Sequence, residues 1–260
     1  MEQAVIMVVS CDRYSDVWSP FFQLFKRFWP DCPYRIFFVT NNLDPKQPGV
    51  TTIRTGDDTT WATQLLSALD RIDSPYVIML LEDYFIRSAV STDRVRQLVE
   101  TGINMNAHCL RLTPRPAPTR PVPGSSGLGL LQPGDHYRVS TQAALWRVET
   151  LRALLRPDQS GWDFESQGTE LSAGFTGGFL GVYRPALDYV QGVVKGKWYP
   201  RGLAACRRAG IEVDRSRRPT MTRWSLLKMI WTYTIVSRIK DELRYFIRRF
   251  LPDHSSAGRT

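Results

Sequence analysis

The chain has 260 residues, of which 43% are hydrophobic and 23% are charged. This length and composition exclude a disordered chain and predict one α/β domain with a full hydrophobic core. The four cysteines show no metal-binding spacing, so we expect reduced packing residues in a cytoplasmic protein and neither a zinc site nor a disulfide framework. No stretch of 18 apolar residues is present, so no membrane-spanning helix is predicted.

The net charge of +9 is concentrated toward the C-terminal end of the sequence. Residues 215–260 contain eleven Lys and Arg against three Asp and Glu, so this segment carries +8 and the remainder is nearly neutral. The basic residues lie outside any recognisable nucleic-acid-binding module. We therefore expect no nucleic acid among the partners.

Apolar periodicity predicts alternating strands and helices over the first half of the chain. Strands are expected at 4–9, 34–40, 50–54 and 76–81, and helices at 18–29, 61–72 and 92–101. This alternation is typical of a Rossmann-like α/β fold, in which helices flank a mixed, mostly parallel sheet.

The segment 113–129 contains five prolines followed by a Gly-Ser-Ser-Gly run. We expect a mobile loop without regular structure beside the ligand site, because loops of this length are usually functional or disordered. A strand at 137–147, a helix at 148–155 and a glycine-weakened strand at 175–183 are predicted after it. We therefore predict one domain at 1–213, with halves at about 1–112 and 130–213, and a tail at 214–260.

Two adjacent carboxylates, Glu82 and Asp83, directly follow the apolar run 76–81. Ligands of open α/β sheets sit outside the carboxyl ends of such strands. Paired carboxylate oxygens at this position suit Mg²⁺ or Mn²⁺ carrying a substrate diphosphate. The alternative is a pair of solvated acids in a turn.

A second acidic element, Ser-Gly-Trp-Asp-Phe-Glu at 160–165, follows a break at Pro157. Beside the first motif, this element offers a remaining carboxylate to act as the base of a metal-assisted transfer. The alternative is a loop whose aromatic side chains dock on the core while its acids face water.

The order of these motifs resembles that of GT-A glycosyltransferases of bacterial polysaccharide or lipopolysaccharide biosynthesis. Three pieces carry the resemblance, which covers about residues 4–200. They are the first strand with Ser-Cys-Asp-Arg-Tyr at 10–14, the helix before Leu-Leu-Glu-Asp-Tyr-Phe at 80–85, and Ala-Ala-Leu-Trp-Arg at 143–147 leading to Trp-Asp-Phe-Glu at 162–165.

The resemblance implies an inverting transfer from a nucleotide sugar, most simply a UDP-sugar, to a hydroxyl of a glycan or lipid-linked acceptor. It assigns Asp12, Arg13 and Tyr14 to the nucleotide, and Asp83 to a Mg²⁺ or Mn²⁺ cofactor with Glu82 as a weaker contact. It also implies that the acidic element at 160–165 is a loop that supplies the catalytic base, assigned to Glu165 with Asp163 second. The chain departs from the D-x-D motif of this family, because Glu82-Asp83-Tyr84 has no second Asp. The set of carboxylate ligands for a metal ion is therefore smaller in this chain than the D-x-D motif provides.

Six further residues have weaker assignments, and several have a plain structural alternative. Donor contacts are assigned to Asp58, Trp61 and Lys197, and acceptor contacts to Arg111, Gln142 and Trp162. An acid before a helix is also favoured by the helix dipole, a tryptophan at a helix start is often core, and Lys197 could belong to a solvated charged turn.

The tail contains a drifting apolar stripe interleaved with Lys and Arg between residues 223 and 251. A basic amphipathic helix of this kind is typical of binding at a membrane surface, here the inner face of the cell membrane. The alternatives are packing of the stripe on the enzyme core or on a second copy of the chain.

Two other functions compete with glycosyl transfer. A nucleotidyltransferase shares a related sheet, but it usually has a glycine-rich basic loop after the first strand, and residues 10–15 contain no glycine. A catalytically inactive, membrane-associated scaffold on a transferase fold is the non-enzymatic alternative, which the incomplete D-x-D motif leaves open.

Overall fold

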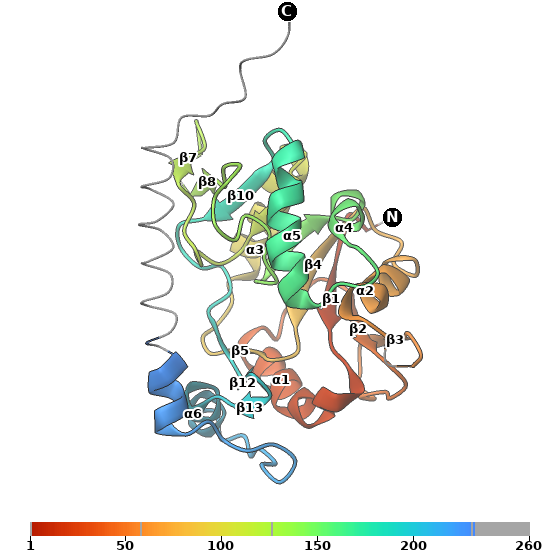
Figure 1. The fold of residues 1–260 in the computed structure, drawn as a ribbon, viewed down its shortest axis with the longest axis vertical. Helices are drawn as coiled ribbons and strands as arrows, with labels where there is room; N and C mark the ends of the chain where they lie inside the picture. The colour runs from red at the N-terminus through yellow and green to blue at the C-terminus, as the bar shows by residue number, and fades with distance from the viewer. Residues whose placement is uncertain (1, 58, 126, 230, 232–260) are drawn as a thin grey trace, which may run out of the picture.

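The computed structural model describes residues 2–57, 59–125, 127–229 and 231 (Figure 1). Within these residues, nine strands form one sheet in the order β3-β2-β1-β4-β9-β6-β10-β8-β7. In that order the strands span Val50–Arg54, Ile36–Thr40, Ala4–Val9, Tyr76–Leu81, Ala144–Arg147, Cys109–Arg111, Phe179–Val182, Leu128–Leu130 and Arg120–Pro121. Two further pairs, β5 (Tyr84–Ile86) with β11 (Tyr189–Gln191) and β12 (Val193–Val194) with β13 (Lys197–Trp198), lie outside this sheet.

The sheet is mixed, and its longest ladders are parallel. Strands β3, β2, β1 and β4 are mutually parallel, whereas β9 is antiparallel to both of its neighbours. In the ladder between β1 and β4, Val9 is opposite Leu81. The loops that follow these two strands therefore emerge side by side at the same edge of the sheet.

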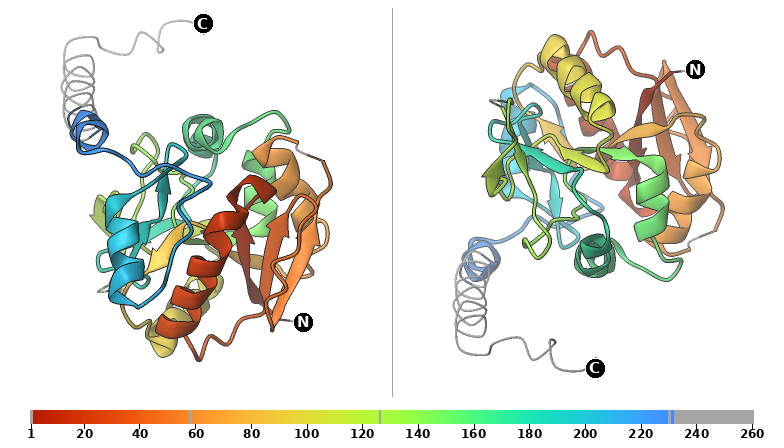
Figure 2. Two further views of the ribbon diagram at one scale, coloured as in Figure 1. Left: turned by 90° about the horizontal axis from the view of Figure 1, so that it is seen from below. Right: turned by 90° about the horizontal axis from the view of Figure 1, so that it is seen from above.

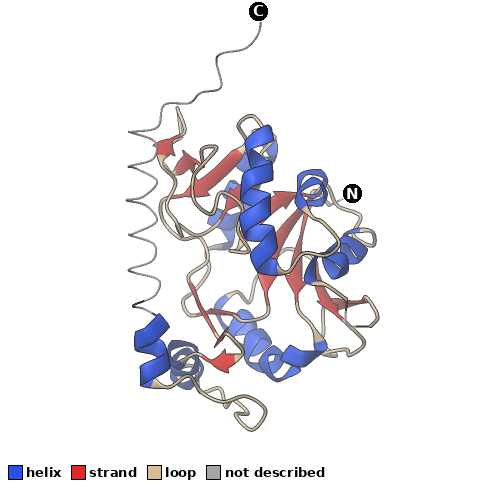
Figure 3. Ribbon diagram, in the orientation of Figure 1, coloured by secondary structure: helices blue, strands red, loops and turns tan. Residues whose placement is uncertain are grey.

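Helices cover both faces of the sheet, as the views in Figures 2 and 3 show. The helices are α1 (Ser15–Phe28), α2 (Trp61–Leu69), α3 (Thr92–Asn104), α4 (Val148–Leu154), α5 (Gly161–Leu171) and α6 (Pro200–Arg208). Alternate residues of β1 enter two separate cores: Ile6 packs in the core that includes α1, α3 and α6, and Met7 in the core that includes α2, α4 and α5. This period of two is the reason why β1 is apolar throughout. The predicted α/β architecture is confirmed.

The proline-rich segment is more ordered than the sequence predicts. Strands β7 and β8 pair antiparallel at the outer edge of the sheet, so the prediction of a loop without regular structure is wrong for part of 113–129. Pro121 is tolerated there because an edge strand does not need every N–H for its ladder. The guanidinium of Arg111 also holds this segment by donating to the carbonyl oxygen of Pro116 over 2.8 Å.

The acidic element at 160–165 is not a loop, and this prediction is corrected. Ser160 caps α5, and Asp163 closes a reciprocal capping box with it, so the element forms the start and first turn of a helix. The same turn buries Phe164 against Trp146 and Trp61. The chemistry of this element therefore has to be considered on a helix.

The predicted tail overlaps the described part of the chain only at its beginning. Residues 223–229 are helical, and Trp224 has 82% of its surface exposed. The remainder of the predicted stripe, apart from Trp231, lies outside the described residues. Among the described helices, none is long and apolar enough to cross a bilayer.

Candidate active site

The acid pair Glu82–Asp83 forms the turn between β4 and β5, at the edge where β1 and β4 end. Both residues are buried, with only 8% and 7% of their surfaces exposed. The alternative that these two acids are solvated is therefore wrong. The backbone carbonyl of Asp83 also accepts a 2.6 Å hydrogen bond from Gly192 N–H, which fixes the turn against the segment between β11 and β12.

Burial strongly affects the ionisation of both acids. It raises the pKa of Glu82 well above its usual range, and the neighbouring Asp83 charge raises it further. Burial also raises the pKa of Asp83, to about 7, although a hydrogen bond from the Val193 backbone and the charge of Arg218 oppose this. A site that holds two such carboxylates favours additional positive charge.

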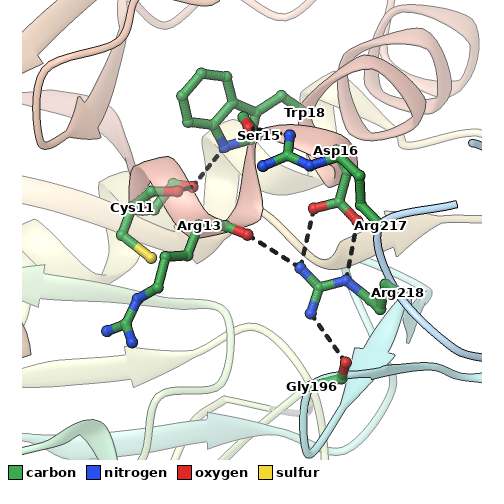
Figure 4. A network of polar contacts seen from close by, with 9 residues as sticks. Cys11, Arg13, Ser15, Asp16, Trp18, Gly196, Arg217 and Arg218 are labelled. Atoms are coloured by element: carbon green, nitrogen blue, oxygen red, sulfur yellow. Dashed lines mark hydrogen bonds and ion pairs between the residues drawn. The ribbon is translucent and has the colours of Figure 1, made fainter.

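Arg218 supplies positive charge at this site from the far end of the described chain. It makes a buried ion pair with Asp16 of α1, at 2.9 Å, and its guanidinium lies 4.4 Å from the centre of the Tyr14 ring. It also donates to the backbone carbonyls of Arg13 and Gly196 (Figure 4). Residues 214–221, which the sequence places in the tail, therefore include part of the site.

Tyr14 and Cys11 lie close enough to the acid pair to be affected by its charge. Burial and then the Glu82 carboxylate raise the pKa of both side chains. The Arg218 charge lowers the pKa of Tyr14, in agreement with its position over the ring. The predicted donor residue Tyr14 therefore lies near Glu82 and Asp83, whose charges both raise its pKa.

A pair of tyrosines connects the acid pair to the acceptor half. Tyr84 stacks on Tyr189, with ring centres 4.3 Å apart, and donates a 2.9 Å hydrogen bond to the carbonyl of Thr141. The charges of Asp83 and Glu165 both raise the pKa of Tyr84, after burial. Tyr84 is therefore within electrostatic reach of the predicted metal ligand and of the predicted base.

Glu165 is held in a defined orientation on α5. Its Oε1 accepts hydrogen bonds from both the backbone N–H and the hydroxyl of Thr141, each 2.8 Å long. Only 9% of its surface is exposed, and burial raises its pKa, whereas the Thr141 donors and the charge of Arg111 lower it. A buried, oriented carboxylate with a raised pKa suits general base chemistry.

Asp163 has a structural role in the same helix. Its Oδ2 accepts hydrogen bonds from the N–H and the hydroxyl of Ser160, at 3.0 and 2.6 Å, and these lower its pKa. Trp162, the predicted acceptor contact beside it, has 64% of its surface exposed. The two residues thus differ from Glu165, whose carboxylate is buried.

Two of the predicted donor residues have structural contacts. The Asp12 carboxylate accepts hydrogen bonds from the backbone N–H groups of residues 41–43 and so fixes the loop after β2. Arg13, next to it, is exposed. Trp61 lies half-buried, with its ring 5.3 Å from that of Phe164, as the core alternative expects.

The predicted acceptor residues Arg111 and Gln142 are on the tyrosine side of the site. The Gln142 side-chain carbonyl accepts a 2.5 Å hydrogen bond from the Tyr189 hydroxyl. Arg111 is 1% exposed and donates to the backbone carbonyls of Pro116 and Tyr137, so it supports the loop from inside. The charge of Arg111 nevertheless lowers the pKa of Glu165.

Lys197 lies in β13, directly after a hairpin turn in which Lys195 and Gly196 both have positive φ angles. Its side chain is exposed, and the structure records no contact between it and the acid pair. The remaining donor residue, Asp58, lies outside the described residues. Arg218 was missed by sequence reasoning, and the only local signal was the density of arginines at 215–218.

The donor set of the acid pair fits a magnesium or manganese ion only in part. Glu82 and Asp83 provide hard carboxylate oxygens in a buried turn, which suits these ions. Within the described residues, no group of three or more His, Cys, Asp and Glu side chains comes together. A cation there would therefore need oxygen ligands from a substrate phosphate and water.

No family model matches the chain, and no curated protein sequence matches it. Several solved structures are similar to it. HddC from Yersinia pseudotuberculosis has 12% identity and a TM-score of 0.49, over 80% of this chain and 99% of that one. For S. aureus TarS the identity is 12% and the TM-score 0.48, over 80% and 39% of the two chains.

A third similar structure is the 2-C-methyl-D-erythritol 4-phosphate cytidylyltransferase from Thermus thermophilus. It has 14% identity and a TM-score of 0.42, and the match covers 81% of this chain and all of that one. The chain spans less than half the length of TarS. At these identities and TM-scores, the comparisons assign no activity to the chain.

Proposed function

We propose that this protein is a GT-A-like glycosyltransferase that moves a sugar from a nucleotide-sugar donor, most simply a UDP-sugar, to a hydroxyl group of a glycan or lipid-linked acceptor. The observation that carries the proposal is the buried acid pair at the carboxyl end of β4. Two buried carboxylates with raised pKa values are unfavourable without a positively charged partner, and the divalent cation that accompanies a substrate diphosphate would provide that charge.

Glu165 is the proposed base of an inverting single displacement. Its free carboxylate oxygen takes the proton of the acceptor hydroxyl while the hydroxyl oxygen forms a bond to the anomeric carbon. The bond from that carbon to the donor diphosphate breaks, and the nucleoside diphosphate leaves with the electron pair. Thr141 holds the other carboxylate oxygen and so orients the base.

Asp83, assisted by Glu82, would hold Mg²⁺ or Mn²⁺, which neutralises charge on the departing diphosphate when bound. Tyr14 and Arg218 form the side of the site next to the acids. The ion pair with Asp16 keeps the guanidinium of Arg218 fixed there. A fixed cation next to the phosphates would contribute to the same charge stabilisation.

The reaction class can be tested by the product released from different nucleotides. Purified protein is incubated with Mn²⁺ and either a panel of nucleotide sugars or the four nucleoside triphosphates with sugar phosphates. A glycosyltransferase releases a nucleoside diphosphate from one nucleotide sugar, by slow hydrolysis even without acceptor. A nucleotidyltransferase instead releases pyrophosphate from a triphosphate.

Glu165→Gln is the matched variant, because it keeps the shape and a hydrogen-bond acceptor for Thr141 but cannot take a proton. We expect it to lower turnover by about 10²- to 10⁴-fold while leaving nucleotide binding intact. Full activity of this variant would contradict the assignment of the base. Absence of both products would instead favour the scaffold function.

We further propose that residues 223–251 bind the inner face of the cell membrane and bring the site to a lipid-linked acceptor. The exposure of Trp224 and Leu227, at 82% and 58%, supports this. Vesicle co-sedimentation of the full chain and of a chain ending at residue 222 tests it. If the full chain does not bind anionic vesicles but forms dimers, the result would instead favour packing of the apolar stripe on a second copy of the chain.

A further inference from the structure

A cavity of about 250 Å³ lies between α6 and the β5–β11 pair. It is lined by Arg87, Val190, Arg201, Ala204 and Arg208. Residues 201, 204 and 208 recur at the spacing of one helical face, so α6 presents two arginines to the same space. Three arginines, all of them exposed, thus line one cavity that is open to the surface.

The charge in this cavity is only partly balanced. Arg87 makes a bidentate ion pair with Asp188, in which Nη2 donates to Oδ1 over 2.9 Å and Nε donates to Oδ2 over 3.0 Å. Among the described residues, neither Arg201 nor Arg208 has a hydrogen-bond or ion-pair partner for its side chain. The three arginines and Asp188 therefore leave a net charge of +2 facing the cavity.

The position of Arg201 in the first turn of α6 is also unfavourable for the helix itself. Positive charge is disfavoured near a helix N-terminus, and the first turn of α6 contains no acid to compensate for it. A local conflict of this kind is typical of a functional position. Arg208, in the last turn, has the favourable placement.

The helix is held firmly against the strand that forms the other wall. A Cβ atom on Gly202 would lie 2.6 Å from the carbonyl oxygen of Gln191, so α6 approaches β11 at a distance that only glycine allows. Arg87 is four residues beyond Asp83, directly after β5. At about 3.3 Å per residue, the Cα atom of Arg87 lies roughly 13 Å from that of Asp83. The start of α6 is closer to the acid pair, because Gly202 packs on Gly192, whose N–H donates to the carbonyl of Asp83.

We propose that this cavity binds a phosphate or diphosphate group through lining residues that do not include the acid pair. Guanidinium groups match phosphate oxygens in bidentate geometry, and the net +2 suits a dianion better than a single carboxylate. The walls formed by Val190 and Ala204 leave the arginines as the groups that recognise the ligand. The phosphate could belong to a lipid headgroup or to a soluble compound.

The surroundings of the cavity allow a lipid as the source of the phosphate. The helix at 223–229, with the exposed Trp224, lies at the same end of the molecule as α6 in the views of Figures 1 and 2. Exposed tryptophan and arginine side chains at one end of a molecule suit binding at a membrane surface. The experiment below separates the two sources.

Binding of inorganic pyrophosphate is measured by calorimetry in EDTA, so that metal-dependent binding at the acid pair does not contribute. The test variant is the double substitution Arg201→Ala with Arg208→Ala, and the matched control is Arg207→Ala, an exposed arginine of the same helix that does not line the cavity. We expect the double variant to lose about tenfold or more in affinity and the control to bind like the wild type. Far-UV circular dichroism and the unfolding midpoint verify that each variant is folded.

The second arm measures co-sedimentation of the same proteins with phosphatidylcholine vesicles, with and without phosphatidic acid. Loss of binding in both arms for the double variant identifies a lipid headgroup as the source, and loss in the pyrophosphate arm alone identifies a soluble phosphate. The proposal is overturned if the double variant binds as well as the wild type in both arms, or if Arg207→Ala weakens binding equally. Because the metal is absent, failure here leaves the proposed transferase function standing.

Discussion

Thr141 opposes the effect of burial on the pKa of the proposed base, Glu165, and this gives a prediction at the scale of single residues. A general base works only when deprotonated, so activity rises with pH through the pKa of Glu165. Burial raises this pKa, which places the rising limb of the kcat/KM profile above about pH 4.3, the usual glutamate value. Thr141→Val removes the hydroxyl donor that stabilises the carboxylate, so we expect the limb to move to higher pH.

The matched control is Thr169→Val, because Thr169 is on the same helix as Glu165 but exchanges its hydrogen bonds with the backbone of Val139. Its pH profile should coincide with that of the wild type. A Thr141→Val profile that also coincides would show that Glu165 is not the titrating base.

Asp163 and Glu165 lie two residues apart but should respond differently to substitution. Asp163→Asn weakens the capping box of α5, so we expect lower stability and activity within a few-fold of the wild type. Ser160→Ala removes the other half of the box and should cost about 1 kcal/mol. Urea unfolding and donor hydrolysis measure the two effects, and a large loss of activity in Asp163→Asn would make Asp163 the better candidate for the base.

At the scale of elements, the buried ion pair between Arg218 and Asp16 fastens residues 214–221 to α1. Arg218→Met leaves the Asp16 carboxylate buried and unpaired, because its side chain is only 1% exposed, and should cost about 3–5 kcal/mol. Adding Asp16→Asn removes that charge and should recover part of the loss. Urea unfolding at neutral pH measures both.

Arg217→Met is the control for this pair. Arg217 is exposed and donates only to the Ser15 hydroxyl, over 2.8 Å, so its loss should change the free energy of unfolding little. Equal stability of the Arg217 and Arg218 variants would show that the ion pair does not hold the segment.

At the scale of the whole molecule, the sequence predicts the sheet better than it predicts the site. The apolar runs of β1 and β4 are buried on both faces, so their composition alone indicates both the strands and the edge at which Glu82 lies. The sequence does contain a signal for the start of α5, since Ser160 and Asp163 have the spacing of a capping box, but an acidic residue at this spacing is equally compatible with a catalytic loop. Arg218 could not be predicted, since its partner Asp16 is 202 residues away along the chain.

The most direct test of the central claim is a thermal-shift measurement with UDP, GDP, CDP and dTDP, each with and without Mn²⁺. A nucleotide at 100 times its Kd stabilises the folded protein by about 2.7 kcal/mol, which is readily measured. We expect one nucleotide to raise the Tm only with the metal, and Asp83→Asn to abolish this shift. Asp93→Asn, at a residue with an 87% exposed side chain on α3, should keep it. The account would be contradicted if no nucleotide shifts the Tm, or if the shift survives in Asp83→Asn.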